Sequence, residues 1–318
     1  MLRAAVAPNL LHYFEDKKMT ANQKRSISGD TVFKSMSVGS GVLILLALAA
    51  VSGFLLFQAI PAFTGKPTAA EGDIFGYLTP LVFGTLYSAT LALLIAVPLS
   101  IGIGLFISHY APRRLAQGLG YVVDLLAAVP SVVYGLWGIM VLAPAVQPLY
   151  AWLVENAAWF PLFSGPVSGT GRTILTVSIV LAIMILPIMS AIAREIFIQT
   201  PTLHQEAALA LGATKWEMIR LSVFPYAKSG LVSAAMLGLG RALGETMAVA
   251  LVLSPARIIS FDLLTSTNST TIAANIALNF PEASGLNVNL LIASGLVLFV
   301  ITMAVNMLAR KIVAGGTK

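Results

Sequence analysis

Residues 173–193 read TILTVSIVLAIMILPIMSAIA and carry no charged side chain. A transmembrane α-helix needs about 20 predominantly apolar residues to cross a bilayer, so this stretch predicts a membrane span. Comparable apolar runs occur on both sides of it. The predicted spans are residues 38–60, 81–108, 119–147, 173–193, 229–254 and 288–308. The chain is therefore predicted to be an all-α polytopic membrane protein with six transmembrane helices.

The composition agrees with this class of protein. Of the 318 residues, 58% are hydrophobic and 10% are charged, whereas about 25% of the residues of soluble proteins are charged. The sequence contains no cysteine, which excludes disulfide scaffolds, thiol catalysis and cysteine-ligated zinc or iron–sulfur clusters. The presence of only three histidines argues against a histidine-rich metal site.

The distribution of Lys and Arg predicts the orientation of the chain. Most of the 19 basic residues fall in the N-terminal segment, in residues 109–118 and 194–228, or at the C-terminus. The opposite side carries Lys66, Arg172 and Arg257. Because cytoplasmic loops of membrane proteins are enriched in Lys and Arg, both termini are expected in the cytoplasm. This topology accounts for the net charge of +6, so membrane lipid is the expected environment and no nucleic-acid partner is expected.

Three regions follow from these spans and charges. Residues 1–37 are predicted to form a cytoplasmic tail, residues 38–308 a six-helix transmembrane domain, and residues 309–318 a second cytoplasmic tail.

The predicted cytoplasmic segment 194–228 is too regular for a flexible linker. The first helix is expected to start at Thr200-Pro201 or at Thr202, where Gln205 would complete a capping box. Gly212 is expected to end it as a left-handed cap. The second helix is expected to start with a capping box of Thr214 and Glu217 and to end at Pro225. The pattern predicts a helix, glycine turn, helix hairpin at about 200–225 on the cytoplasmic face. An ordinary interfacial linker is the alternative interpretation.

The hairpin contains a recognisable motif. Glu206-Ala207-Ala208 is followed after three residues by Gly212 and after nine more by Ser222-Val223-Phe224-Pro225. This resembles the EAA loop of ABC importer permeases, in which the last element is Ile, any residue, Leu and Pro. Ser222 and Phe224 depart from that pattern. The resemblance implies that Glu206, Ala207, Ala208 and Gly212 shape a helix that inserts into a groove of the ATP-binding subunit.

No phosphate-binding loop accompanies this motif. The pattern GxxxxGK[S/T] does not occur, and Gly65-Lys66 is followed by Pro67. The chain is therefore expected to be no enzyme and to hold no cofactor, with ATP and Mg used by a partner ATPase.

The fifth predicted span carries two charges, Arg241 and Glu245. An arginine at the bilayer centre costs about 2.5–3.5 kcal/mol on insertion scales, so Arg241 is expected to face a polar cavity or a partner. On a continuous helix the two residues form one stripe with Ala234, Gly238 and Ala248.

Two interpretations of this pair stand. In the first, Arg241 and Glu245 only neutralise each other as an i, i+4 pair. In the second, the guanidinium of Arg241 offers paired donors to a passing oxyanion, since it binds phosphate-like groups bidentately. Glu245 would hold Arg241 in place when the site is empty, and would accept a hydrogen bond from an oxyanion that still carries a proton, as phosphate does and sulfate does not.

The third predicted span contains a second irregular stretch. Pro130 and Ser131, with Gly135 and Gly138, allow a bend of the kind that cavity-lining helices need. Ser131 and Tyr134 are candidates for the same pathway. For Tyr134, packing is an equal alternative.

Two strings carry a closer resemblance. GLGRALGETMAV at Gly238–Val249 and AVPSVVYGLWG at Ala128–Gly138 look like the PstC branch of phosphate-specific ABC transporter permeases. The resemblance implies a type I ABC importer permease fold and phosphate import by alternating access across a prokaryotic cytoplasmic (inner) membrane. The implied partners are a PstA-type permease, a PstB-type ATPase dimer and an external PstS-type binding protein. The family's intramembrane arginine and glutamate correspond to Arg241 and Glu245.

Other functions remain open at this point. A permease for sulfate or molybdate is one alternative, because Arg241 alone would suit any oxyanion. A secondary transporter or channel would also use a buried Arg and Glu pair, but it predicts internal inverted repeats and leaves the hairpin unexplained. A pure assembly subunit predicts that the substitution Arg241→Ala is silent.

Overall fold

The computed structural model describes the backbone of residues 7–64 and 73–315, and the side chains of residues 29–64 and 73–311. Parts of the two predicted tails and the basic residue Lys66 lie outside the described residues. The chain divides into two compact units, Met1–Phe57 and Gln58–Lys318.

Helix α1 (Ala7–Thr64) is a single helix of 58 residues that runs from the first unit into the second. Most of the predicted tail, residues 1–37, therefore belongs to this helix. Between Gly29 and Phe57 most described side chains are exposed, including large apolar ones such as Phe33, Leu43 and Phe57. An apolar surface of this kind matches a lipid environment.

The second unit is built from helices. In chain order they are α2 (Ile74–Leu105), the π-helix η1 (Phe106–Tyr110), α3 (Arg113–Ala127), α4 (Ser131–Trp137), the π-helix η2 (Gly138–Leu142), α5 (Ala143–Ala157), the 3₁₀-helix η3 (Pro161–Phe163), α6 (Ile174–Ile198), α7 (Thr202–Ala210), α8 (Lys215–Met218), the π-helix η4 (Ile219–Val223), α9 (Phe224–Leu243), α10 (Met247–Val252), α11 (Ile272–Asn279), the 3₁₀-helix η5 (Phe280–Glu282) and α12 (Leu286–Gly315). The described residues form no β-strand beyond one isolated bridge. The predicted all-α class is confirmed.

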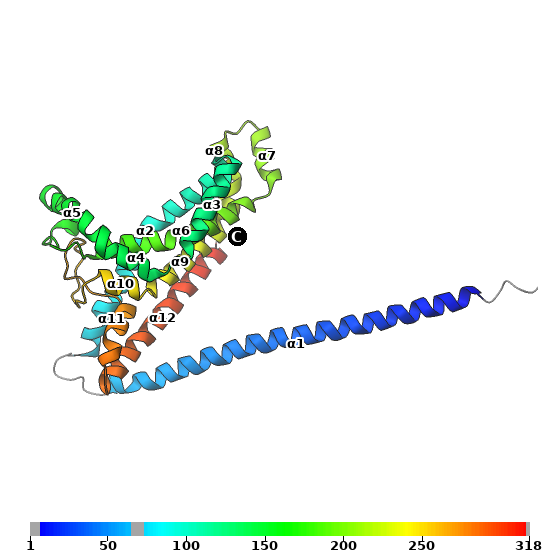
Figure 1. The fold of residues 1–318 in the computed structure, drawn as a ribbon, viewed down its shortest axis with the longest axis horizontal. Coiled ribbons are helices and arrows are strands. Elements are labelled where there is room, and N and C mark those ends of the chain that lie inside the picture. The colour runs from blue at the N-terminus through cyan, green and yellow to red at the C-terminus, as the bar shows by residue number, and fades with distance from the viewer. Residues whose placement is uncertain (1–6, 65–72, 316–318) are drawn as a thin grey trace, which may run out of the picture. The chain divides into compact units, whose positions relative to one another are not determined.

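Helix α6 lies at the centre of the second unit, where α2 and α9 pack against it (Figure 1). It is apolar around its whole circumference, which is typical of a buried helix. Ile174, Leu181 and Ile185 are completely buried in the largest core cluster. The Thr173 side chain caps the first turn by accepting a hydrogen bond from the Thr176 N–H at 3.1 Å. The central predicted span is thus a regular helix.

Five helical segments among the described residues are long and apolar enough to cross a membrane. They are Gly29–Thr64, Ile74–Tyr110, Ser131–Ala157, Ile174–Ile198 and Leu286–Lys311. The fifth predicted span, residues 229–254, is absent from this set because it is not one continuous helix.

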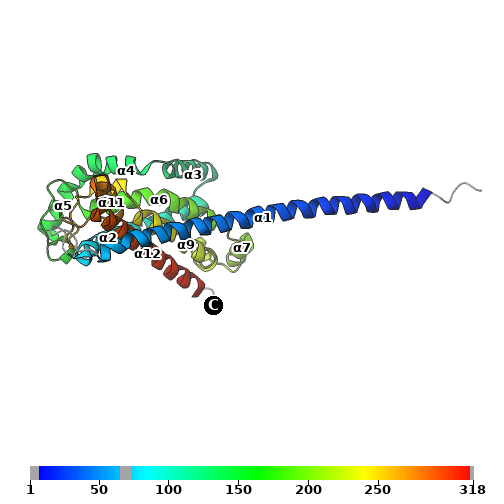
Figure 2. The ribbon, with the colours of Figure 1, turned by 90° about the horizontal axis from the view of Figure 1, so that it is seen from below.

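The third predicted span is also interrupted, so its predicted bounds of 119–147 are wrong. Helix α3 ends at Ala127 and a new helix starts at Ser131 after Pro130. Proline lacks an N–H and disfavours helical backbone in the residue before it, which explains the break. Figure 2 shows α3 and α4 separated by this non-helical link.

The break in the fifth predicted span lies at Gly244–Thr246. Helix α9 ends at Leu243, and α10 starts at Met247. Arg241 is therefore in the last turn of α9, whereas Glu245 lies in the link. The predicted stripe from Ala234 to Ala248 on one helix is wrong, because α9 ends before Glu245 and Ala248 lies on the separate helix α10.

Candidate functional site

Arg241 lines a cavity of about 690 Å³ between α6, α9 and α12. The cavity walls are mostly apolar, and the other polar side chains that reach it are Ser233 and Asn306. Within the part of the chain that the structure describes, the Arg241 guanidinium forms no hydrogen bond and no ion pair. Its donors are therefore available to a ligand in the cavity.

Glu245 has a different environment from Arg241. Its side chain is buried, with 8% of its surface exposed, and its Oε1 atom accepts a hydrogen bond from the Ala248 N–H at 3.1 Å. Among the described residues the one ion pair joins Arg194 to Asp124 at 3.9 Å. Arg241 and Glu245 thus do not form the expected pair in this structure, because the chain leaves the helix between them.

Helix α4 packs closely against α10 (Figure 1). A Cβ atom on Gly135 would lie 2.8 Å from the Ala248 Cα, and one on Gly138 would lie 3.0 Å from a methyl group of Val252. The absence of a side chain at both glycines permits this approach. Gly138 is the first residue of η2, which continues α4. Since the two contacts follow the same order along both segments, α4 and α10 run in the same direction, and their starts lie within about one helical turn of each other.

The two breaks therefore lie close together in the second unit. Non-helical backbone within a membrane span is stable only where protein buries it or where it lines a cavity. The link Ala128–Pro130 and the link that contains Glu245 meet this condition through the packing of α4 on α10. Such paired interruptions are typical of transport pathways.

Tyr134 and Ser131 both belong to the start of α4. The Tyr134 hydroxyl donates a hydrogen bond to the Leu126 carbonyl of α3 at 2.8 Å, which bridges the break. Tyr134 is buried. Ser131 is half-buried. Neither residue lines the cavity of Arg241. Of the four predicted pathway residues, Arg241 therefore lies at the cavity, whereas the other three lie at or beside the two breaks.

Sequence reasoning did not single out Ser233 and Asn306 as site residues. The Ser233 hydroxyl donates to the Ser229 carbonyl at 3.0 Å, whereas the Asn306 amide makes no hydrogen bond within the described residues. An asparagine near the end of the apolar sixth span is the signal that would have identified Asn306, because polar side chains within spans tend to be functional.

The hairpin around Gly212 is formed by α7 and α8. Gly212 has a φ of +87°, the left-handed conformation that glycine adopts readily. Thr214 and Glu217 make a reciprocal capping box, in which the Thr214 N–H donates to the Glu217 carboxylate at 2.8 Å and the Glu217 N–H donates to Thr214 Oγ1 at 3.3 Å. The hydrogen bonds from Thr214 hold the pKa of the Glu217 carboxyl below its ordinary value.

Two details of the hairpin differ from prediction. Thr202 forms no capping box, because α7 starts after Pro201 and the Gln205 amide donates instead to the Thr200 carbonyl at 3.1 Å. Pro225 does not end a helix, since α8 continues through η4 into α9 and Pro225 lies in the first turn of α9. The wider π-turn accommodates the missing N–H of the proline.

Helix α7 exposes the residues of the EAA motif. Glu206 and Ala207 are exposed and Ala208 is half-buried. The neighbouring Leu203 and Leu211 expose 73% and 90% of their surface. Exposed apolar side chains beside charged ones are typical of a protein interaction site.

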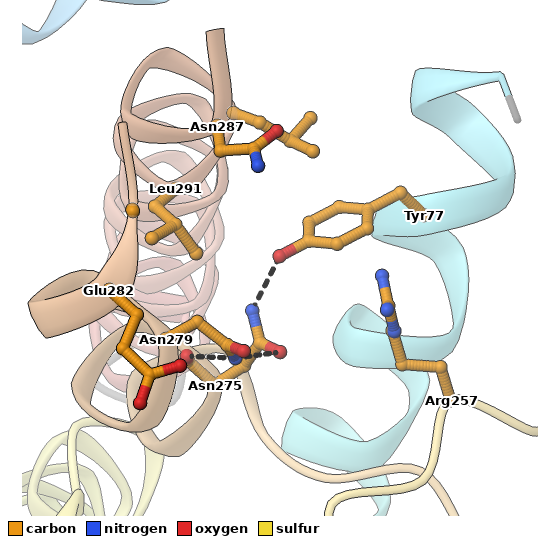
Figure 3. Close-up of a pocket in the computed structure, with 9 residues that line it drawn as sticks. Tyr77, Arg257, Asn275, Asn279, Glu282, Asn287 and Leu291 are labelled. Atoms are coloured by element: carbon orange, nitrogen blue, oxygen red, sulfur yellow. Dashed lines mark hydrogen bonds between the residues drawn. The ribbon is translucent and has the colours of Figure 1, made fainter. Parts of the chain in front are cut away.

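A second cavity, lined mainly by polar side chains, lies at the end of the second unit away from the hairpin. It has a volume of about 210 Å³ and is lined by Tyr77, Arg257, Asn275, Asn279, Glu282, Ala283, Asn287, Leu290 and Leu291. Figure 3 shows the Asn275 amide donating to the Tyr77 hydroxyl, a distance of 2.6 Å. Arg257 lies 4.8 Å from the centre of the Tyr77 ring. This cavity contains none of the predicted site residues.

Solved structures with a similar fold include chains of ABC transporters. One is a bacterial ABC transporter involved in the import of alginate, with a TM-score of 0.62, 16% identity and coverage of 93% of this chain and 100% of that chain. Another is the MetNI methionine ABC transporter, with a TM-score of 0.52, 17% identity and coverage of 76% and 94%. Residues 100–314 match the family described as binding-protein-dependent transport system inner membrane component. Fold and family together define an ABC importer permease.

Curated relatives narrow this class. The chain is 46% identical over 303 residues to the phosphate transport system permease protein PstC 2 of Mycobacterium tuberculosis. The aligned region covers 91% of this chain and 92% of the relative. It is 44% identical to PstC of Mycobacterium leprae, with coverage of 90% and 93%, and 38% identical to PstC of Haemophilus influenzae, with coverage of 88% and 92%. The chain belongs to the PstC family of phosphate transport permeases.

Proposed function

We propose that this chain is the permease subunit of an ATP-driven importer that moves inorganic phosphate across a prokaryotic inner membrane by alternating access. The observation that carries the proposal is the 38–46% identity to phosphate transport permeases over about nine tenths of the chain. The predominance of Lys and Arg in the segments on the side of the termini supports a cytoplasmic location for both ends.

In this proposal Arg241 binds the phosphate oxygens. A guanidinium presents two parallel N–H donors that match a phosphate edge, and Arg241 faces a cavity without a competing partner. Ser233 and Asn306 add hydroxyl and amide groups at the same cavity. Glu245 would accept a hydrogen bond from a protonated phosphate oxygen once it releases the Ala248 N–H, with Ser131 and Tyr134 along the same pathway.

The proposed partners follow from the exposed surfaces and the family. A PstB-type ATPase dimer would dock on α7 through Glu206, Ala207 and Ala208, with Gly212 setting the turn of the hairpin. A PstA-type permease would complete the pathway, and a PstS-type binding protein would deliver phosphate on the outside. The ATPase would use ATP and Mg, and this chain would hold no cofactor.

Uptake of radiolabelled phosphate tests the proposal. The chain and its presumed partners are expressed in cells without their own high-affinity phosphate permease, with labelled sulfate in parallel. We expect saturable phosphate uptake that sulfate does not compete and that Arg241→Ala abolishes at unchanged membrane levels. Lys228→Ala is the matched control, because Lys228 is an exposed cation on the same helix outside the cavity.

The other outcomes are informative. Uptake of sulfate in place of phosphate would identify a permease for another oxyanion. Phosphate uptake that Arg241→Ala leaves intact would keep the family but remove Arg241 from the substrate site.

A further inference from the structure

Arg172 binds the carboxyl end of the short helix α10. Its Nε atom donates to the Val252 carbonyl at 3.2 Å, and its Nη2 atom donates to the carbonyls of Leu251 and Leu253 at 3.3 and 3.5 Å. The last carbonyls of a helix lack partners within the helix and carry partial negative charge, so a guanidinium is well suited to this position.

The other end of α10 is held by Glu245, which accepts the Ala248 N–H. A helix of six residues is far too short to be stable alone. Its position therefore depends on these two end contacts and on its packing against α4, α6 and α11. Since α10 begins two residues after Glu245, a shift of α10 also moves the link that carries Glu245 and the end of α9 that carries Arg241.

Arg172 itself is fixed in place. Gly171 before it has a φ of +68°, and a side chain there would collide with the Ala143 carbonyl. The Thr176 hydroxyl donates to the Gly171 carbonyl at 2.6 Å. Thr173, the next residue, caps α6. Arg172 is thus joined rigidly to the first turn of α6.

Helix α6 connects Arg172 to the hairpin. It is unbroken from Ile174 to Ile198, and α7 starts at Thr202. A displacement of the hairpin that shifts α6 along its axis would therefore also shift Arg172, which contacts α10 directly.

We propose that Arg172 is a positioning residue that passes movement of α6 to α10, and through α10 to Glu245 and Arg241. The inference rests on the proposed function, because it assigns the substrate pathway to the same break. It gives Arg172 a role in coupling rather than in contacting phosphate.

The test uses the complete transporter in proteoliposomes and measures the number of phosphate ions transported per ATP hydrolysed. For Arg172→Ala we expect a ratio about tenfold lower, while ATP hydrolysis stimulated by the phosphate-loaded binding protein stays within about twofold of wild type. Arg172→Lys keeps the charge but not the fork of donors, so we expect an intermediate ratio. Gln147→Ala is the control, since Gln147 donates to the nearby Gly169 carbonyl without touching α10.

A purely structural role for Arg172 would lower the amount of assembled complex and would reduce transport and hydrolysis in parallel, with an unchanged ratio. That result would overturn the inference. If Arg172→Ala does not assemble, the ratios of Arg172→Lys and Arg172→Gln decide in the same way. Arg241→Ala is measured alongside: normal transport by that variant counts against the proposed function, whereas loss of transport there combined with a normal ratio for Arg172→Ala counts against this inference alone.

Discussion

Helix α6 and the α9–α10 pair differ sharply, although the sequence predicts both as continuous spans. Helix α6 is unbroken and buried in the core. The α9–α10 pair is interrupted at Gly244–Thr246 and places one charge beside a cavity and the other in the break. One predicted span is thus a continuous helix with dense packing, whereas the other contains non-helical backbone of the kind that is stable only where protein buries it or where it lines a cavity.

The largest expected effect of a substitution lies in the core of α6. Leu181 is completely buried, and Leu181→Ala should lower the free energy of unfolding by about 2–5 kcal/mol, because a cavity remains where the side chain packed. Thermal unfolding of the purified protein measures this. Leu94→Ala is the control, since Leu94 exposes 67% of its surface. Equal losses for both variants would contradict the central role of α6.

A smaller effect is expected at Gly138, the first residue of η2, which lies close to both regions. A methyl group on Gly138 would lie 2.6 Å from a methyl group of Val180 on α6 and 3.0 Å from one of Val252 on α10. Gly138→Ala should therefore cost about 1–3 kcal/mol through overpacking. Gly102→Ala, on α2, meets no atom within 4 Å and serves as the control. The same thermal measurement applies, and a wild-type melting temperature for Gly138→Ala would show that the three helices separate easily.

The break itself can be tested at Gly244. A Cβ atom there would meet only the Gly240 carbonyl oxygen, at 3.5 Å, so alanine fits without a clash. Alanine favours helix over glycine by about 1 kcal/mol, which should extend α9 into the link and slow phosphate uptake about fivefold at normal membrane levels. Uptake assays at saturating phosphate measure this. An unaffected rate would mean that the interruption is not needed for transport.

The smallest effect concerns the hairpin that joins the two regions. The pKa of Glu217 is lowered from 4.5 by hydrogen bonds from Thr214. A lowered pKa in the folded state stabilises the hairpin above the unfolded pKa, and this contribution disappears as the pH falls through the folded value. The protection factors of the α8 amides, which are exchange rates corrected for the intrinsic pH dependence of exchange, should therefore fall below pH 4.5 in the wild type. Glu217→Gln should show the lower protection already at neutral pH, and wild-type protection in that variant would contradict the assignment.

Much of the fold could be predicted from the sequence, because spans depend mainly on apolar length. The stretch around α6 and the turn at Gly212 are local signals of this kind. The breaks were not predictable in the same way, since hydropathy is insensitive to backbone interruptions. Whether Pro130 or Gly244 bends, breaks or leaves a helix intact depends on neighbours such as α10 that are distant in the sequence.

The candidate site was predictable only in part for the same reason. Arg241 stands out as a charge in an apolar span, and the structure places it at a cavity. Glu245 would pair with Arg241 only on a continuous helix, and its carboxylate instead accepts the Ala248 N–H. The sequence predicts a helix end at Pro225, but the π-helix η4 before it lets the helix continue.

Ser222 gives the hairpin a mechanical character. Its hydroxyl donates to the His204 carbonyl at 3.1 Å and so fastens η4 to α7 at the position where the EAA pattern has isoleucine. Apolar packing permits sliding, whereas a hydrogen bond has a preferred direction. We therefore expect α7 and η4 to move together as one rigid body. A rotation of the hairpin would then be passed mainly to α6 and α9, the helices at its two ends.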